Sequence, residues 1–131
     1  MSEIDSKFVI EFGNKQKEAY SVNVANGWWR ERNNIDCALI LEGIEYHPHL
    51  AIELIGLMHT ELSEAVEAAR KHAFCTWSDH KTKDTMVREL AGTVVRIMDM
   101  AQFFDLPLGK AIEAEIESNQ TRGRMHGGKK A

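Results

Sequence analysis

The chain has 131 residues, 44% of them hydrophobic, which is typical of one globular domain and too apolar for a disordered chain. Its 16 Lys and Arg residues against 20 Asp and Glu residues give a net charge of −4, so we expect no binding of a nucleic-acid polymer through a basic surface. The apolar stretches fall short of the roughly 20 residues that span a bilayer, and the start of the chain lacks a signal-peptide pattern. We therefore expect a cytoplasmic protein with no membrane partner.

The first predicted helix runs from Phe8 to about Ala25. Gly27 ends it, because glycine is the usual residue just past a helix C-terminus. A second, short helix is predicted from Ile35 to about Tyr46, and a third, with the strongest periodicity in the chain, from Pro48 to about His72. The apolar stripe of this third helix is its expected core face and consists of Ala51, Leu54, Ile55, Met58, Leu62, Ala65, Val66 and Ala69.

A polar loop of about ten residues is expected from Phe74 to about Lys83, followed by a helix that Asp84 or Thr85 caps and that ends at Phe104. The expected core face of that helix consists of Val87, Leu90, Ala91, Val94, Ile97, Met98 and Ala101. Its other side carries Glu89, Gly92, Arg96 and Asp99.

The last predicted helix runs from Leu108 to Asn119, after a break at Pro107, which cannot continue a helix. No segment alternates between apolar and polar residues over a length that would build a sheet. The elements together predict an all-α bundle of four to five helices. We expect a single domain over residues 1–120 and a basic, glycine-rich tail over 121–131.

Acidic side chains on two of the predicted helices form a candidate metal site. Glu61 and Glu64 are three residues apart, so they project from the same side of their helix, and Glu89 lies one helix later. Carboxylates held this close repel one another unless a cation neutralises them. Hard oxygen ligands without clustered His or Cys favour Mg²⁺, with Mn²⁺ as the alternative, and Mg²⁺ commonly takes further ligands from phosphates. A solvated acidic helix face is the alternative interpretation of the same spacing.

Four segments of the chain resemble parts of a known family, in that family's order. They are Asn26–Trp29 (NGWW), His59–Arg70 (HTELSEAVEAAR), Arg88–Asp99 (RELAGTVVRIMD) and Asn119–Lys130 (NQTRGRMHGGKK). The second and third resemble the two halves of the motif of MazG-like nucleoside triphosphate pyrophosphohydrolases. The first and last are similar to phage-type and cassette-type members of that family.

The resemblance implies an all-α NTP pyrophosphatase fold that assembles through its helices as a homodimer or homotetramer. It also implies Mg²⁺-dependent hydrolysis of a nucleoside triphosphate to the monophosphate and pyrophosphate, with Glu61, Glu64 and Glu89 as metal-binding, catalytic residues. Candidates for contact with the substrate are Trp28 or Trp29, which could stack on the base, and, for the phosphates, Arg96, Arg122, Arg124 and Lys129. The alternatives are a solvated surface position for each cation, and a place in the core or in a dimer interface for at least one Trp.

The chain departs from the family pattern at one position. The pattern is ExxE, a spacer, then ExxD, and Gly92 stands where the fourth acid is expected. Asp99 lies seven residues after Gly92 on the same predicted helix, about 10 Å along its axis, so it cannot take the place of the missing acid on the same ion. A nucleotide-binding homologue with impaired catalysis and a helical oligomeric interaction protein are therefore the alternatives to an active enzyme.

Overall fold

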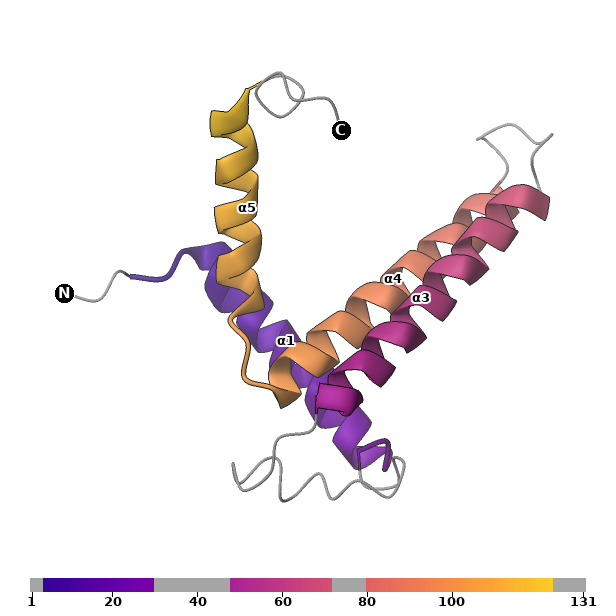
Figure 1. Cartoon of the computed structure of the whole chain (residues 1–131), viewed down its shortest axis with the longest axis horizontal. Helices are drawn as coiled ribbons and strands as arrows, with labels where there is room; N and C mark the ends of the chain where they lie inside the picture. Colours follow the sequence, from indigo (N-terminus) through magenta and orange to yellow (C-terminus); the bar gives the residue numbers. More distant parts are fainter. Residues whose placement is uncertain (1–3, 30–47, 72–79, 124–131) are drawn as a thin grey trace.

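The computed structural model describes residues 4–29, 48–71 and 80–123, which are largely helical (Figure 1). The helices are α1 (Lys7–Ala25), α3 (Pro48–Lys71), α4 (His80–Phe103) and α5 (Leu108–Arg122). No strand occurs within these ranges, so the all-α fold class is confirmed for the described part of the chain. The helix predicted from Ile35 to Tyr46 lies outside it.

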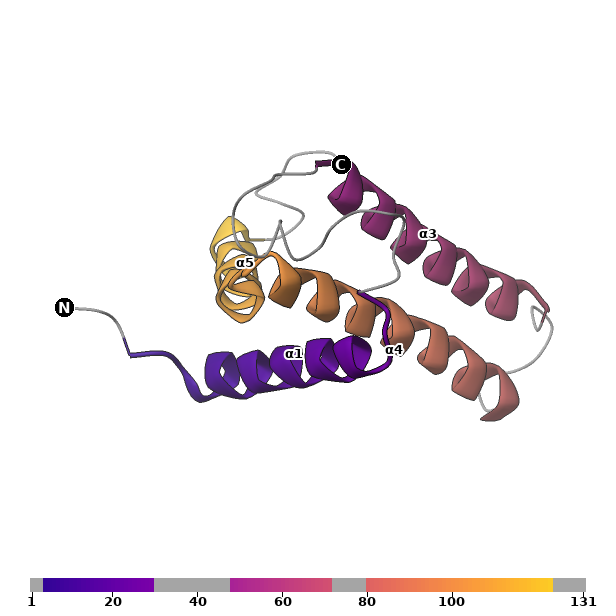
Figure 2. The ribbon, with the colours of Figure 1, turned by 90° about the horizontal axis from the view of Figure 1, so that it is seen from below.

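Helix α4 occupies the centre of the arrangement. It pairs with α3 in an antiparallel hairpin and packs against α1 on another side, whereas α5 contacts α1 (Figures 1 and 2). The C-terminal end of α5 points away from the α3–α4 pair (Figure 1). None of the helices in the described ranges is long and apolar enough to cross a bilayer.

The ends of α1 are fixed by local hydrogen bonds. The Ser6 hydroxyl accepts from the Val9 amide at 3.1 Å, which caps the first turn, and donates to the Glu113 carboxylate of α5 at 2.8 Å. At the other end Gly27 has a positive φ of 84°, a conformation that glycine adopts without steric cost. The predicted end of this helix is therefore confirmed.

The break before Pro107 is a Schellman-type ending of α4. The Leu106 amide donates to the Ala101 carbonyl at 2.7 Å, and the Asp105 amide donates to the Gln102 carbonyl at 3.1 Å. Asp105 has a φ of 54°, in the left-handed region that Asp tolerates better than most residues. This turn sends the chain back toward α1, where Gly109 packs against the Phe12 ring.

The main core cluster lies where the ends of α1, α3 and α4 meet. It consists of Trp29, Leu50, Leu54 and Phe103, with Tyr20, Met100 and Phe104 packed against it. The Trp29 and Phe103 rings stack with their centroids 4.1 Å apart and an interplanar angle of 4°. Aromatic pairs of this kind add to the free energy gained from burial alone.

Polar side chains tie α1 to α4 beside this cluster. Asp99 accepts hydrogen bonds from the Trp29 indole at 2.9 Å and from the Asn23 amide at 2.7 Å. Farther along α1, the buried Gln16 donates to the Gln102 side chain and to the Leu106 carbonyl. Asp99 therefore orients the segment that carries Trp28 and Trp29, and position 99 is structural.

Replacing Asp99 with Ala is expected to lower the free energy of unfolding by about 2–3 kcal/mol, because two donors, one of them on the buried Trp29, lose a charged acceptor. Asn is expected to cost about 1 kcal/mol, since its carbonyl still accepts from the indole and the Asn23 amide can turn to present its oxygen. Urea denaturation followed by helical circular dichroism measures both changes. An Asp99→Ala variant as stable as the wild type would contradict this role.

Two predicted boundaries on the C-terminal side are wrong. Helix α4 begins at His80, so residues 80–83 are helical although they were expected in a loop, and neither Asp84 nor Thr85 is the cap of this helix. Polarity alone predicted a loop at residues 80–83, yet they include no Gly or Pro that would oppose a helix. Helix α5 continues to Arg122, beyond the expected end at Asn119, and so includes the first residues of the expected tail.

The expected core faces of α3 and α4 are only partly correct. Leu54, Met58 and Ala65 are buried on α3, and Met98 and Ala101 on α4. Several other members of the two stripes are exposed, namely Ile55, Leu62 and Val66 on α3 and Val87, Leu90 and Val94 on α4. The two helices contact each other through a face rotated toward the polar flank, so these apolar side chains are left exposed in the single chain.

Candidate metal centre

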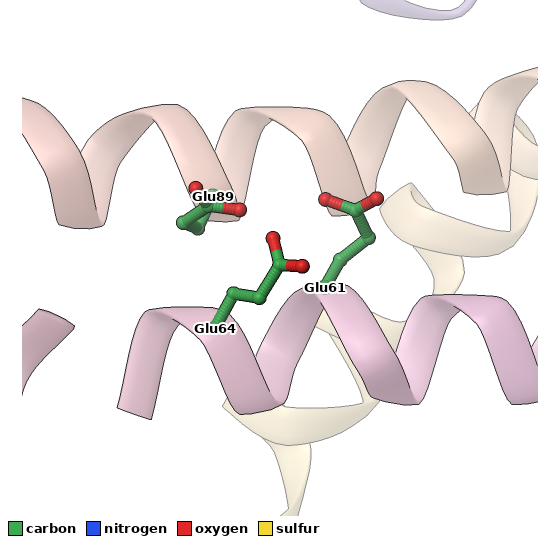
Figure 3. Close-up of side chains that lie close together, drawn as sticks. All are labelled: Glu61, Glu64 and Glu89. Atoms are coloured by element: carbon green, nitrogen blue, oxygen red, sulfur yellow. The ribbon is translucent and has the colours of Figure 1, made fainter. Parts of the chain in front are cut away.

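Three carboxylates meet between α3 and α4. Glu61 and Glu64 come from α3 and Glu89 comes from α4, and one oxygen of each lies within 4.8 Å of the others (Figure 3). The structure therefore brings together the three acids that the sequence predicted. Glu64 is exposed, while Glu61 and Glu89 are half-buried.

The helix pairing explains why these acids converge. Glu61 and Glu64 share a side of α3 because residues three apart on a helix are neighbours. Leu54, Met58 and Glu61 follow one another along the contact face of α3, at intervals of four and then three residues, the spacing found in coiled coils. On α4, Glu89 precedes the buried Thr93 by one turn on the face toward α3. The acids thus lie along the packed seam, with Met58 buried before them on α3 and Ala65 and Ala68 buried after them.

The proximity of the carboxylates changes the proton affinity of one of them. The pKa of Glu89 is raised above its ordinary value, first by a hydrogen bond shared with Glu64, then by partial desolvation and by repulsion from Glu64 and Glu61. A carboxyl group that is costly to ionise is one that a cation would stabilise. A cation placed among the three carboxylates would relieve this repulsion.

Arg96 pairs with the acid cluster. Its Nε donates to Glu61 Oε1 at 2.8 Å, and both side chains are partly shielded, at 34% and 19% exposure. Two features of the sequence are consistent with this pairing: Glu61 borders an apolar stripe, where a charge requires a partner, and Arg96 shares a face with Glu89 and Gly92. Arg96, expected to contact phosphates, is thus a partner of Glu61 in this structure.

Gly92 lies directly beside the Glu61 carboxylate. A Cβ atom built at position 92 would lie 3.3 Å from Glu61 Oε2, closer than most side-chain contacts. The absence of a side chain at position 92 therefore leaves room for the Glu61 carboxylate against the backbone of α4. Gly92, which replaces an acid of the ExxE–ExxD pattern, is therefore also the residue that gives the Glu61 carboxylate its space.

Trp28 and Trp29, the two tryptophans predicted to contact the base, have different environments. Trp29 is 5% exposed and stacked on Phe103, so its ring is part of the core and is not accessible to a nucleotide base. Trp28 is 51% exposed, and the Arg96 guanidinium carbon lies 5.8 Å from its ring centroid. Trp28 is therefore the aromatic side chain that lies near the acid cluster with an accessible surface.

Of the remaining predicted cations, only Arg122 lies within the described residues, and it is not at the cluster. Arg122 is exposed at the end of α5, which points away from the α3–α4 pair (Figure 1). Arg124 and Lys129 lie outside the described residues. The sequence therefore identified the three acids. Arg96 is the predicted cation that lies beside them, and it pairs with Glu61.

Comparisons of the chain with models of protein families, with curated proteins and with solved structures found no match. A function for this chain accordingly has to be argued from its motifs and from the arrangement of its own side chains.

Proposed function

We propose that the chain is a MazG-like, Mg²⁺-dependent nucleoside triphosphate pyrophosphohydrolase. In this reaction a water molecule attacks the α-phosphorus, the bond to the β-phosphate breaks, and nucleoside monophosphate and pyrophosphate are released. The observation that carries the proposal is the convergence of Glu61, Glu64 and Glu89 from two antiparallel helices, with one oxygen of each within 4.8 Å of the others. The ExxE spacing and the order of the resembling segments support the same function.

The donor set fits a hard divalent cation. Mg²⁺ binds oxygens at 2.0–2.1 Å, which places the oxygens of its octahedron about 3–4 Å apart. Oxygens within 4.8 Å of one another can reach that spacing through small side-chain rotations. Glu61, Glu64 and Glu89 would hold the ion, and Mn²⁺ suits the same oxygens. When bound, the ion neutralises charge on the phosphates and lowers the pKa of bound water.

The surrounding residues supply binding surfaces for the nucleotide. The exposed ring of Trp28 can stack on a base, and the Arg96 guanidinium lies between that ring and the acids. A site acid that is not fully engaged by the ion can orient the attacking water. Arg122, Arg124 and Lys129 remain candidates for the phosphates through the C-terminal segment or through a second copy of the chain.

The metal site predicts a linked dependence on pH. Because the pKa of Glu89 is higher in the folded chain than in the unfolded chain, its contribution to stability is complete below the unfolded pKa and is lost as pH rises through the folded pKa. Mg²⁺ is therefore expected to raise the melting temperature at neutral pH, and this gain should shrink as pH falls through the Glu89 pKa. Thermal melts from about pH 4 to 8, with and without Mg²⁺, measure it. An Mg²⁺ gain independent of pH would contradict the assignment.

The decisive experiment is direct detection of the products. The full chain is incubated with each ribonucleoside and deoxyribonucleoside triphosphate in Mg²⁺ or Mn²⁺, and monophosphate and pyrophosphate are quantified together. Equimolar release of both is expected for at least one nucleotide. Release of inorganic phosphate with the diphosphate, or of nothing from any nucleotide, would count against a pyrophosphohydrolase.

A second candidate function is nucleotide binding with impaired turnover. It is favoured by Gly92, which removes an acid of the family pattern, and by Arg96, which occupies an oxygen of Glu61. Melting-point increases with a nucleotide and Mg²⁺, in the absence of pyrophosphate release, would support this candidate.

The exposed apolar surface favours a homo-oligomer as part of this function. Its members are 42–65% exposed and are Ile52, Ile55, Leu62 and Val66 of α3 and Val87, Leu90 and Val94 of α4. On a helical wheel with 100° per residue, the exposed apolar residues of each helix lie next to its α3–α4 contact face, on the side reached by turning in the sense of the helix. Because the two helices are antiparallel, these two sides lie on the same side of the pair and adjoin. Their exposed surface is on the order of 600 Å², the upper range for a monomer and near the area each partner contributes to a stable interface. A homodimer, or a homotetramer built from it, would cover this surface.

Replacing Val66 or Leu90 with Glu is expected to convert the oligomer to a monomer with unchanged helix content, since a carboxylate would be buried at the interface without a partner. Sedimentation equilibrium measures the mass. Arg88→Glu, on the opposite flank of α4, is the matched control and should leave the mass unchanged. A monomeric wild-type chain at high concentration would exclude this interface.

A further inference from the structure

Glu61 differs from the other two acids of the cluster in its contacts. It is the member that a described cation holds, through Arg96 Nε at 2.8 Å. Its second oxygen, Oε2, lies against the α4 backbone at Gly92. Both oxygens of Glu61 thus have a neighbour on α4, and a metal ion that binds this carboxylate has to share it with the guanidinium or displace it.

The pair is shielded enough for this competition to matter. The side chains of Glu61 and Arg96 are 19% and 34% exposed, so water and salt screen their attraction less than that of a surface pair. Arg96 Nε donates to Glu61 Oε1, and the guanidinium carbon of Arg96 lies 5.8 Å from the centroid of the Trp28 ring. The guanidinium is therefore held at the cluster by α4, in the position where a mobile cation would otherwise gather.

We propose that Arg96 is a built-in counter-ion of Glu61, which competes with a divalent cation for the same carboxylate. The inference rests on the metal site of the proposed function but not on hydrolysis. The geometry that carries it is the Glu61–Arg96 contact across α3 and α4, together with the space that Gly92 leaves for the carboxylate. In the absence of metal, Arg96 lowers the repulsion within the cluster, and it makes Glu61 a weaker ligand for metal.

The test is a titration of the full, metal-free chain with Mn²⁺ alone, in which electron paramagnetic resonance counts the free ion. Arg96→Met removes the charge and keeps the length of the side chain. It is expected to bind Mn²⁺ about tenfold more tightly than the wild type, because three carboxylates then act without an internal cation. Arg96→Lys keeps the charge and should stay near the wild type. Arg88→Met, which removes an exposed cation from the same helix, is the control for net charge.

A second readout separates competition from a purely structural role. Without metal, Arg96→Met should melt below the wild type, and Mn²⁺ should raise its melting temperature by more than it raises that of the wild type. Equal or weaker Mn²⁺ binding by Arg96→Met would overturn the proposal, since it would make Arg96 a residue that holds Glu61 in place for the ion. Failure of both proteins to bind Mn²⁺ would overturn the metal site itself, and the counter-ion role with it.

Discussion

Replacing Glu89 with Gln is expected to reduce pyrophosphate release by about a thousandfold or more, while the metal-free chain becomes more stable than the wild type. Gln keeps the size of the side chain but removes the charge that Glu64 and Glu61 repel, and this repulsion is one cause of the raised pKa of Glu89. If Glu89 only supported the fold, its replacement would lower the free energy of unfolding of the chain. The combination of lower activity and higher stability is therefore the signature of a group held for catalysis at a cost in folding free energy. Steady-state pyrophosphate assays and urea denaturation give the two values.

Glu61→Gln provides an informative contrast within the same cluster. It is also expected to abolish pyrophosphate release, but it breaks the pair with Arg96 and should lower the free energy of unfolding by about 1 kcal/mol. Glu67→Gln, on an exposed face of α3, is the matched control and should change neither value appreciably. If Glu89→Gln retained full turnover, the acid cluster would not be the catalytic centre.

The local elements were predictable because their causes are local. The helix from Pro48 ends within one residue of the predicted position, and α1 ends at Gly27, where a positive φ stops the helix. Pro107 marked the break after α4, although the left-handed Asp105 that makes the turn was not predicted. Periodicity and glycine or proline punctuation carry this information within a few residues of sequence.

The direction in which each helix faces was harder to predict, because it depends on neighbours distant in sequence. The wheel of α4 assigned Leu90 and Val94 to the core, yet both are exposed, and the polar flank with Glu89 and Arg96 faces α3 or its edge. An amphipathic pattern identifies an apolar stripe but not which surface covers it. A stripe that another copy covers and a stripe buried in the monomer have the same sequence signature.

The site shows the same division between local and distant information. The ExxE spacing alone places Glu61 and Glu64 together, whereas Glu89 was a candidate third acid from the next helix, and the structure brings it to the other two. The Glu61–Arg96 pair spans 35 positions, so no local pattern specifies it. Sequence reasoning therefore identified the acids and named Arg96 as a phosphate contact, but it missed the pairing of Arg96 with Glu61.

Gly92→Asp is expected to bind Mg²⁺ about tenfold more tightly and to raise turnover, through two effects that the structure makes separate. The new carboxylate stands beside Glu61, where a Cβ atom lies 3.3 Å from Oε2, an oxygen at the flexible end of its side chain. It also precedes Arg96 by four residues, a spacing at which acid and guanidinium attract on a helix. The introduced side chain would thus add a ligand and give Arg96 an alternative partner to Glu61. Isothermal titration with Mg²⁺ and pyrophosphate assays measure the two outcomes.

Controls at position 92 distinguish the charge from the added bulk. Gly92→Asn has nearly the same shape without the charge, and Gly92→Ala adds only the Cβ atom that displaces Glu61 by a few tenths of an ångström. Both also remove a helix-interior glycine, whose cost relative to Ala is about 1 kcal/mol, so both can raise the melting temperature without affecting metal binding. Metal affinity must therefore be compared directly and not inferred from stability. If the Asp and Asn variants had the same Mg²⁺ affinity, the space beside Glu61 would not be a ligand position, and the missing acid would not explain any loss of turnover.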